Sequence, residues 1–331
     1  KHCRAQTRCV RWKNLQIRNA YIRGDRKHMD SQQDKGSFRR VGVVARHHTE
    51  TILESVLTVE AVLQRAEIDV VVDADTASVL PQGAHKIVEK SALENLDLVV
   101  VVGGDGSLLG YGRDLAASGV PVVGVNRGGL GFLAAVSPEQ IETSFEQILR
   151  GDFAIEEHFL LQASVNRQGQ VIAMQSALND VVVNPGSPAR MMEFALWVDD
   201  EYVYDQRSDG LIIASPTGST AYALSAGGPI MHPGLDAIVI VPMFPHTLTS
   251  RPLVVPGEKV LRLRLLDVSD AEPQMSCDYQ IHVELQIGDE IVIEKHSAPL
   301  RLLYPPGHSF YQSCRSKLDW GSRLGGQRAE L

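Results

Sequence analysis

The period of the hydrophobic pattern changes near Gly151, and this change limits what the chain can fold into. Before it, short apolar runs alternate with segments whose apolar residues recur every three or four positions. Leu96–Val102 is a continuous apolar run, which is typical of a parallel strand covered on both faces. Thr49–Arg65 follows a helical period, and Thr49 can cap the helix. Strands that alternate with helices predict an α/β domain built on a parallel sheet.

After Gly151, apolar and polar residues alternate at every second position, as on a strand with one buried face. The alternation is clear in residues 194–198, 261–265 and 291–293, and turn residues separate these runs. We therefore expect an all-β, sandwich-like C-terminal domain, with one helical interruption near Ser219–Ala226.

The two patterns predict five segments along the 331 residues. Residues 1–38 are rich in basic side chains and are expected to form a disordered extension. Residues 39–151 are predicted to be the α/β phosphate-binding domain and residues 152–296 the β-rich domain. Residues 297–320 have a mixed character and are expected to return to the first domain, and residues 321–331 to form a flexible tail.

The formal net charge of −8 is unevenly distributed. Residues 1–40 hold 12 Lys and Arg but only 3 Asp and Glu, so the head carries +9 and the remainder −17. An acidic body argues against non-specific binding of nucleic acid. No apolar run approaches the ~20 residues that a membrane-spanning helix needs, so we expect no membrane partner.

The four cysteines are Cys3, Cys9, Cys277 and Cys314, and none forms a Cys-x-x-Cys pair. No group of histidines and cysteines has the spacing of metal ligands. We therefore predict neither a disulfide framework nor a metal site built by the protein alone. A chain of this kind suits a reducing compartment, and we expect a cytoplasmic location.

A glycine-rich loop, Gly103–Ser107, follows the Leu96–Val102 run and precedes Ser107–Ser118, which is predicted to be a helix. Open α/β sheets bind ligands beyond the carboxyl ends of their strands. Glycines let the backbone approach an anion, and the amides of a helix N-terminus point toward it. The loop is neither a Gly-x-x-x-x-Gly-Lys-Ser/Thr motif nor a Gly-x-Gly-x-x-Gly motif. It predicts a polyphosphate site of a different kind.

Asp105 is the unusual residue of this loop, because a carboxylate repels phosphate unless it has a role there. It can bind Mg²⁺, or it can take a proton from an attacking hydroxyl as a general base. Alternatively, it caps the helix that follows. A second glycine cluster, Gly128–Phe132, either borders the same cleft or is only a connecting loop.

Three further stretches make the pattern specific. They are Asn179–Val182, the long segment Asp209–Ile230, which contains Thr-Gly-Ser-Thr-Ala-Tyr, and Ser250–Pro252. In this order, and together with the Gly-Gly-Asp-Gly loop, they closely resemble the NAD kinases, and the bacterial ATP-NAD kinases in particular. The resemblance covers about Arg39 to Gly326. It implies an enzyme that transfers the γ-phosphate of ATP to the 2′-hydroxyl of the adenosine ribose of NAD.

The resemblance also implies a set of nucleotide-binding positions. They are Gly103, Gly104, Asp105, Gly106, Asn179, Asp180, Arg190, Arg207, Asp209, Thr220, Ala221, Tyr222, Ala223, Leu224, Ser225 and Gln280. Asp105 would be the catalytic base, and Gly106 would contact the same nucleotide. ATP would bring Mg²⁺ and rest on the glycine loop, and the family implies a homodimer or homotetramer.

The remaining implied roles concern the rest of NAD. Asn179 and Asp180 would hold ribose hydroxyls and adenine-side groups, and Asp209 would meet the nicotinamide end. Arg190 and Arg207 would offer charge to the pyrophosphate, although read alone they are also ordinary surface charges.

The adenine pocket would be lined by the segment that follows the Thr-Gly-Ser-Thr motif. Thr220, Ala221 and Ser225 would border it, Tyr222 would form a flat wall, and Gln280 would lie close by.

One departure from the family pattern concerns the turn that contains Gln280. The family usually has Gly where this chain has Tyr279, so we expect Tyr279 to affect the turn, since a non-glycine residue with positive φ is uncommon. Two other functions share the glycine loop or the pocket. One is a lipid kinase of the diacylglycerol or sphingosine type, and the other is a non-catalytic sensor that binds NAD or NADP.

Overall fold

The computed structural model describes residues 38–46, 49–81, 85–127, 131–187, 190–268 and 272–320. The predicted basic extension, apart from Phe38, and the predicted tail lie outside these ranges. Gly128–Leu130 of the second glycine cluster also lie outside them. Among the described residues no helix is long and apolar enough to cross a membrane.

A seven-stranded sheet forms the first part of the fold, with the strand order β3-β2-β1-β4-β5-β19-β6. Every neighbouring pair is parallel except β19 with β6. The strands are β1 (Arg40–Ala45), β2 (Asp69–Asp73), β3 (Lys86–Val88), β4 (Leu98–Gly103), β5 (Val122–Asn126), β6 (Ala154–His158) and β19 (Leu300–Tyr304). Because β6 still pairs in this sheet, the chain leaves it only after His158, and β19 later brings the chain back beside β5.

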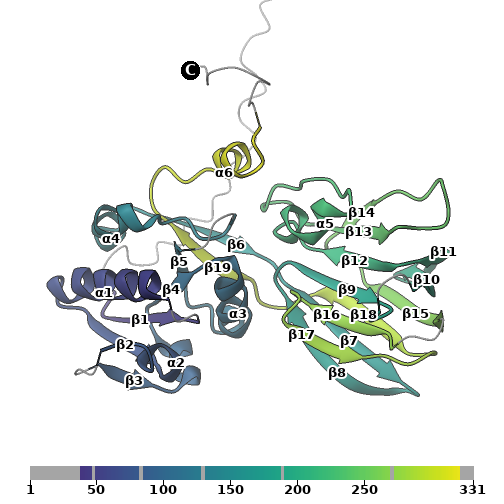
Figure 1. Cartoon of the computed structure of the whole chain (residues 1–331), viewed down its shortest axis with the longest axis horizontal. Helices are drawn as coiled ribbons and strands as arrows, with labels where there is room; N and C mark the ends of the chain where they lie inside the picture. Colours follow the sequence, from purple (N-terminus) through teal and green to yellow (C-terminus); the bar gives the residue numbers. More distant parts are fainter. Residues whose placement is uncertain are drawn as a thin grey trace, which may run out of the picture. The chain divides into compact units, whose positions relative to one another are not determined.

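Helices cover both faces of this sheet (Figure 1). α1 (Glu50–Arg65) and α4 (Ile141–Leu149) pack on one face around Val59, Leu63 and Phe145. α3 (Asp105–Leu115) packs on the opposite face. Cover on both faces explains why β4 is apolar at nearly every position and fully buried. α2 (Ala74–Ala77) follows β2.

The helix boundaries differ slightly from the sequence predictions. Thr49 caps α1 as predicted, and its hydroxyl accepts a hydrogen bond from the amide of Ile52 at 3.4 Å. α3 begins at Asp105, two residues before the predicted start, because Gly104 takes the N-cap position. Glycine has poor helix propensity, but packing of α3 against the sheet overrides it here.

Two six-stranded antiparallel sheets form the second part and pack face to face as a sandwich. One has the order β11-β10-β15-β18-β7-β8 and the other β14-β13-β12-β9-β16-β17. The first sheet consists of β7 (Leu161–Arg167), β8 (Gln170–Ala177), β10 (Met192–Val198), β11 (Glu201–Ser208), β15 (Leu261–Val268) and β18 (Glu290–Lys295). The second consists of β9 (Asp180–Asn184), β12 (Gly210–Ala214), β13 (Ala237–Met243), β14 (Leu253–Pro256), β16 (Gln274–Cys277) and β17 (Ile281–Glu284).

The alternation seen in the sequence is the alternation between the two faces of these sheets. Leu261, Leu263 and Leu265 point into the sandwich core, whereas the arginines between them do not belong to it. The outer face of the second sheet is covered by α5 (Tyr222–Ser225), which lies in the predicted helical interruption. α6 (Phe310–Lys317) follows β19.

The turn between β16 and β17 carries the unusual backbone expected at Tyr279. Asp278 and Tyr279 have φ angles of 50° and 57°, both in the left-handed region. The amide of Gln280 donates to the carbonyl of Cys277 at 3.0 Å and closes the turn. Two adjacent left-handed residues without a glycine store strain, which persists only where surrounding contacts fix the conformation.

We predict that Tyr279→Gly stabilises the protein by about 0.5–1 kcal/mol, because glycine adopts positive φ without a steric penalty. The Tyr279 side chain is 85% exposed, so little packing is lost. Urea unfolding followed by circular dichroism measures the change. Tyr202→Gly, on a strand and also half exposed, is the matched control and is expected to destabilise. Equal losses in both variants would contradict the strain argument.

Candidate active site

Asp105 is the first residue of α3, directly beyond the carboxyl end of β4. Its Oδ2 accepts a hydrogen bond from the amide of Phe132 at 2.6 Å, and its Oδ1 accepts from the amides of Leu133 and Ala134 at 3.2 and 3.3 Å. The N-cap position of α3 belongs to Gly104 and has no side-chain hydrogen bond. Asp105 is therefore not the cap of its own helix, and three backbone amides of a separate loop fix the direction of its carboxylate.

The second glycine cluster borders Asp105 through Gly131. A Cβ at Gly131 would lie 2.5 Å from Asp105 Oδ1, so only glycine allows the loop to come this close. Ala134 continues the same loop to a backbone position against Gly124 of β5. Of the two readings of this cluster, the described part supports the one in which it borders the loop that carries Asp105.

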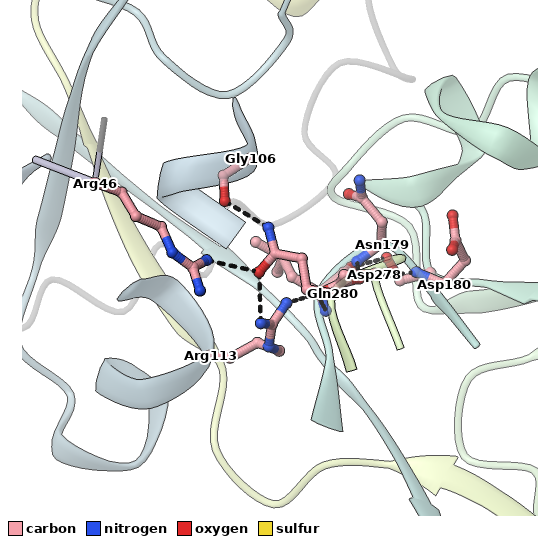
Figure 2. A network of polar contacts seen from close by, with 9 residues as sticks. Arg46, Gly106, Arg113, Asn179, Asp180, Asp278 and Gln280 are labelled. Carbon is pink, nitrogen blue, oxygen red and sulfur yellow. Dashed lines mark hydrogen bonds and ion pairs between the residues drawn. The ribbon is translucent and has the colours of Figure 1, made fainter. Parts of the chain in front are cut away.

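Gln280 joins the N-terminal turn of α3 to the sandwich (Figure 2). Its Nε2 donates to the carbonyl of Gly106 at 2.7 Å. Its Oε1 accepts from Arg113 at 2.7 Å and from Arg46 at 3.0 Å. Both ends of the Gln280 amide thus contact protein groups, and this side chain connects Gly106, Arg46 and Arg113.

Asp278 holds the centre of the same network. It pairs with Arg113 at 2.6 Å, and the two side chains are only 0% and 7% exposed. The Asp278 carboxylate also accepts hydrogen bonds from three consecutive backbone amides, those of Leu178, Asn179 and Asp180, at 2.9, 2.7 and 3.2 Å. A buried charge is tolerated only when it is paired and hydrogen-bonded, and both conditions are met here.

The helix α3 presents three residues to this network from one face. Gly106, Gly110 and Arg113 are spaced by four and three positions, which places them on the same side of a helix. A Cβ at Gly110 would lie 2.6 Å from Nη1 of Arg46, so this glycine makes room for the guanidinium. Arg46 and Arg113 were not singled out from the sequence, although the spacing of the two glycines and Arg113 was a usable signal.

Asn179 and Asp180 lie at the start of β9, at the far end of the network. Asp180 is 5% exposed, and burial together with the nearby charge of Asp278 raises its pKa to about 7. Gly218 packs against the carbonyl of Asn179 so closely that no side chain fits there. The Thr-Gly-Ser-Thr motif is therefore held directly against the Asn-Asp pair.

The residues of α5 continue from this contact. Tyr222 is 45% exposed, and burial and the charge of Asp180 raise its pKa above the ordinary value. Ala223 is fully buried in the cluster under α5, so its side chain supports the helix. The neighbouring positions Thr220, Ala221 and Leu224 are partly buried, and Ser225 is exposed.

Three predicted positions belong to the region around β10–β12. Arg190 is exposed just before β10, and Arg207 is exposed on β11. Asp209 is partly buried between β11 and β12, and its amide donates to the carbonyl of Met243 at 2.9 Å. The network of Figure 2 does not include these residues, whereas it joins Gly106 to Asn179 and Asp180.

A polar cavity of about 580 Å³ lies beside the loop that holds Asp105. It is lined by Asn126 at the end of β5, by Gly131 and Ala134 of that loop, and by hydroxyl and amide side chains of α4 and α6. Among the described residues, no Asp or Glu lines this cavity. In the described part of the chain, no group of three or more His, Cys, Asp or Glu side chains can hold a metal ion.

Comparison with known proteins identifies the family. Residues 41–153 match the ATP-NAD kinase N-terminal domain, and residues 178–303 match the ATP-NAD kinase C-terminal domain. The NAD kinase of Ectopseudomonas mendocina is 49% identical over 290 residues, which cover 87% of this chain and 98% of that protein. The NAD kinase of Pseudomonas fluorescens SBW25 is 48% identical over the same shares of both chains.

Two solved structures have a fold similar to that of this chain. The crystal structure of an NAD kinase from Archaeoglobus fulgidus in complex with ATP superposes with a TM-score of 0.66 at 28% identity, over 85% of this chain and 98% of that one. Yeast NADH kinase complexed with NADH has the same fold, with a TM-score of 0.78 at 24% identity, over 89% of this chain and 90% of that one. Both predicted halves of the architecture are confirmed, and the chain belongs to the NAD kinase family.

Proposed function

We propose that this chain transfers the γ-phosphate of ATP to the 2′-hydroxyl of the adenosine ribose of NAD. The observation that carries the proposal is a continuous set of contacts. It runs from the loop of Asp105 and Gly106, through Gln280, Arg113 and Asp278, to the backbone of Asn179 and Asp180. A carboxylate that must act on a sugar hydroxyl needs its own position fixed relative to the groups that hold the sugar.

In the proposed reaction Asp105 removes the proton of the 2′-hydroxyl as the ribose oxygen attacks the γ-phosphorus, and ADP leaves. The three amides that hold the carboxylate keep it in one orientation for this step. Gly106 has no side chain, so the nucleotide can approach the helix N-terminus closely. Asn179 has both a donor and an acceptor and suits the ribose and adenine-side groups of NAD.

The adenine would lie against the α5 segment. The half-exposed ring of Tyr222 offers a flat apolar face, and Thr220, Ala221 and Ser225 add small side chains to the same segment. Arg190 and Arg207 are proposed to meet the pyrophosphate and Asp209 the nicotinamide end. For Gln280 we propose a positioning role, because its amide already bonds Gly106, Arg113 and Arg46.

ATP, the phosphoryl donor, would bind at the glycine loop beside Asp105. The backbone amides of Gly103 and Gly104 and of the N-terminus of α3 can donate hydrogen bonds to phosphate oxygens. The polar cavity next to Gly131 adds hydroxyl and amide groups that can donate as well. Magnesium bound to the ATP phosphates would neutralise charge on the transferring group. Because Mg²⁺ keeps several water ligands and binds substrate phosphates readily, we propose that the ion arrives on ATP.

We further propose that the enzyme acts in the cytoplasm as a homodimer or homotetramer, with NAD and ATP as its small-molecule partners. The acidic body supports the absence of a nucleic-acid partner.

We predict that Asp105→Asn lowers the rate of NADP formation by about 10²–10⁴-fold, the usual range for loss of a general base. Asparagine has nearly the same shape and can still accept an amide hydrogen bond, so NAD binding should change little. The measurement is initial-rate kinetics with ATP-Mg²⁺ and NAD, combined with calorimetric titration of NAD.

The control is Asp114→Asn, on the same helix. Asp114 is exposed and pairs with Lys90, so this variant should keep its activity. If Asp105→Asn stays within about tenfold of the unmodified rate, Asp105 is not the base.

The buried Asp180 predicts a pH dependence of stability. Its pKa is raised from 3.8 to about 7, so the folded protein holds this proton more tightly than the unfolded chain does. The carboxyl therefore favours folding below about pH 4, and this contribution is lost as the pH rises toward 7. Asp180→Asn removes the titration, so its stability relative to the unmodified chain should be higher at pH 8 than at pH 5. Urea unfolding at both pH values tests this, and an equal difference at the two would show that Asp180 ionises normally.

A further inference from the structure

His158 is a buried polar side chain that the proposed mechanism does not use. It is the last residue of β6, at the point where the chain leaves the seven-stranded sheet for the sandwich. The residue is 2% exposed. A buried imidazole needs hydrogen-bond partners to offset its lost hydration, so its contacts should reveal what it does.

The imidazole reaches across to the nucleotide-binding segment. Its Nδ1 lies 2.8 Å from the hydroxyl oxygen of Thr217, which is 6% exposed. Thr217 stands in the middle of the Ser-Pro-Thr-Gly-Ser-Thr motif, and its carbonyl accepts a hydrogen bond from the hydroxyl of Thr220 at 3.2 Å. One side chain of the α/β sheet thus contacts the turn that leads directly into α5.

The surroundings of His158 favour one tautomer. Its Nε2 makes no hydrogen bond and lies 3.7 Å from Oε2 of Glu156, a half-exposed carboxylate on the same strand. A carboxylate at this distance favours a proton on Nε2. Nδ1 is then the acceptor, and the hydroxyl of Thr217 donates to it.

A second neighbour of His158 is Tyr304, at the end of β19. The Tyr304 ring lies 6.4 Å from the imidazole and stacks on His308 at 3.8 Å. Tyr304 belongs to the buried cluster that packs against α3, the helix that begins with Asp105. His158 therefore contacts the turn that precedes α5 and lies beside a residue of the cluster under α3.

We propose that His158 is a positioning residue, which fixes the Thr217 turn and the α5 segment relative to the sheet that carries Asp105. The inference rests on the proposed function, because it assigns to α5 the adenine side of NAD. A hydrogen bond suits this role better than apolar packing does, since it is directional and is costly to leave unmade in a dry site. His158 would act only through Thr217, without touching NAD.

The test uses two pairs of variants of the full chain. Thr217→Val keeps the shape but removes the hydroxyl, whereas Thr217→Ser keeps it. His158→Leu removes the acceptor, whereas His158→Asn places an amide near the position of Nδ1. The dissociation constant for NAD is measured by calorimetry, and KM for NAD and ATP by initial rates.

We expect Thr217→Val and His158→Leu each to weaken NAD binding about tenfold, while KM for ATP stays within twofold. The double variant should be no worse than either single variant, because both remove the same bond. Thr217→Ser and His158→Asn should retain most of the affinity.

Three results would overturn the proposal: additive losses in the double variant, an NAD affinity of Thr217→Val within twofold of the unmodified chain, or an equal rise in KM for both substrates. Thr217→Val preserves the shape of the side chain, so its NAD affinity tests the proposal even if His158→Leu fails to fold. If the unmodified chain binds NAD without turnover, the kinase reaction is wrong, yet the binding measurements still decide the role of His158.

Discussion

The carboxylate of Asp278 is the point on which the arrangement of the site depends. It sits with no solvent exposure and satisfies four donors, one guanidinium and three successive amides. The amides belong to the chain that enters β9, and the guanidinium of Arg113 belongs to α3. One group thus joins the backbone of the Asn179–Asp180 pair to the helix that begins with Asp105. Removing one partner of a buried ion pair usually costs about 3–5 kcal/mol.

Holding Asp278 in this position has a structural cost. The turn that carries it needs two left-handed residues, and neither is a glycine. The charge of Asp278 also helps to keep the neighbouring Asp180 protonated up to about pH 7. Strain and burial of charge are concentrated within a few residues of the proposed nucleotide pocket. This is where proteins commonly accept such costs, because a fixed geometry there serves binding and reaction.

The sequence predicted those features of the fold that depend on near neighbours in the chain. The Thr49 cap, the buried run of β4 and the alternation in β15 each follow from a local period, and all three are present. α3 begins two residues before the predicted start, because its packing against the sheet outweighs the poor helix propensity of glycine. The Arg113–Asp278 contact joins residues 165 positions apart, and no local pattern encodes such a pairing. The same is true of the amides of 132–134 that hold Asp105. A resemblance could suggest that Asp105 is catalytic, but only the folded arrangement shows what orients it.

The α/β sheet and the sandwich contribute different groups to the site. The α/β sheet supplies the carboxylate and the helix N-terminus, and the sandwich supplies the Asn-Asp pair and the α5 segment. Apolar packing alone would hold these parts together without fixing their relative position, because it is not directional. Hydrogen bonds between polar groups are directional and fix the relative position. Gln280 and Arg113 join the sheets on the α3 side, and His158 joins them where the chain passes from one to the other. With contacts at two separate places, rotation of the sandwich about either one would strain the other. These contacts therefore keep the Asn179–Asp180 pair and α5 of the sandwich in register with the Asp105 carboxylate of the α/β sheet.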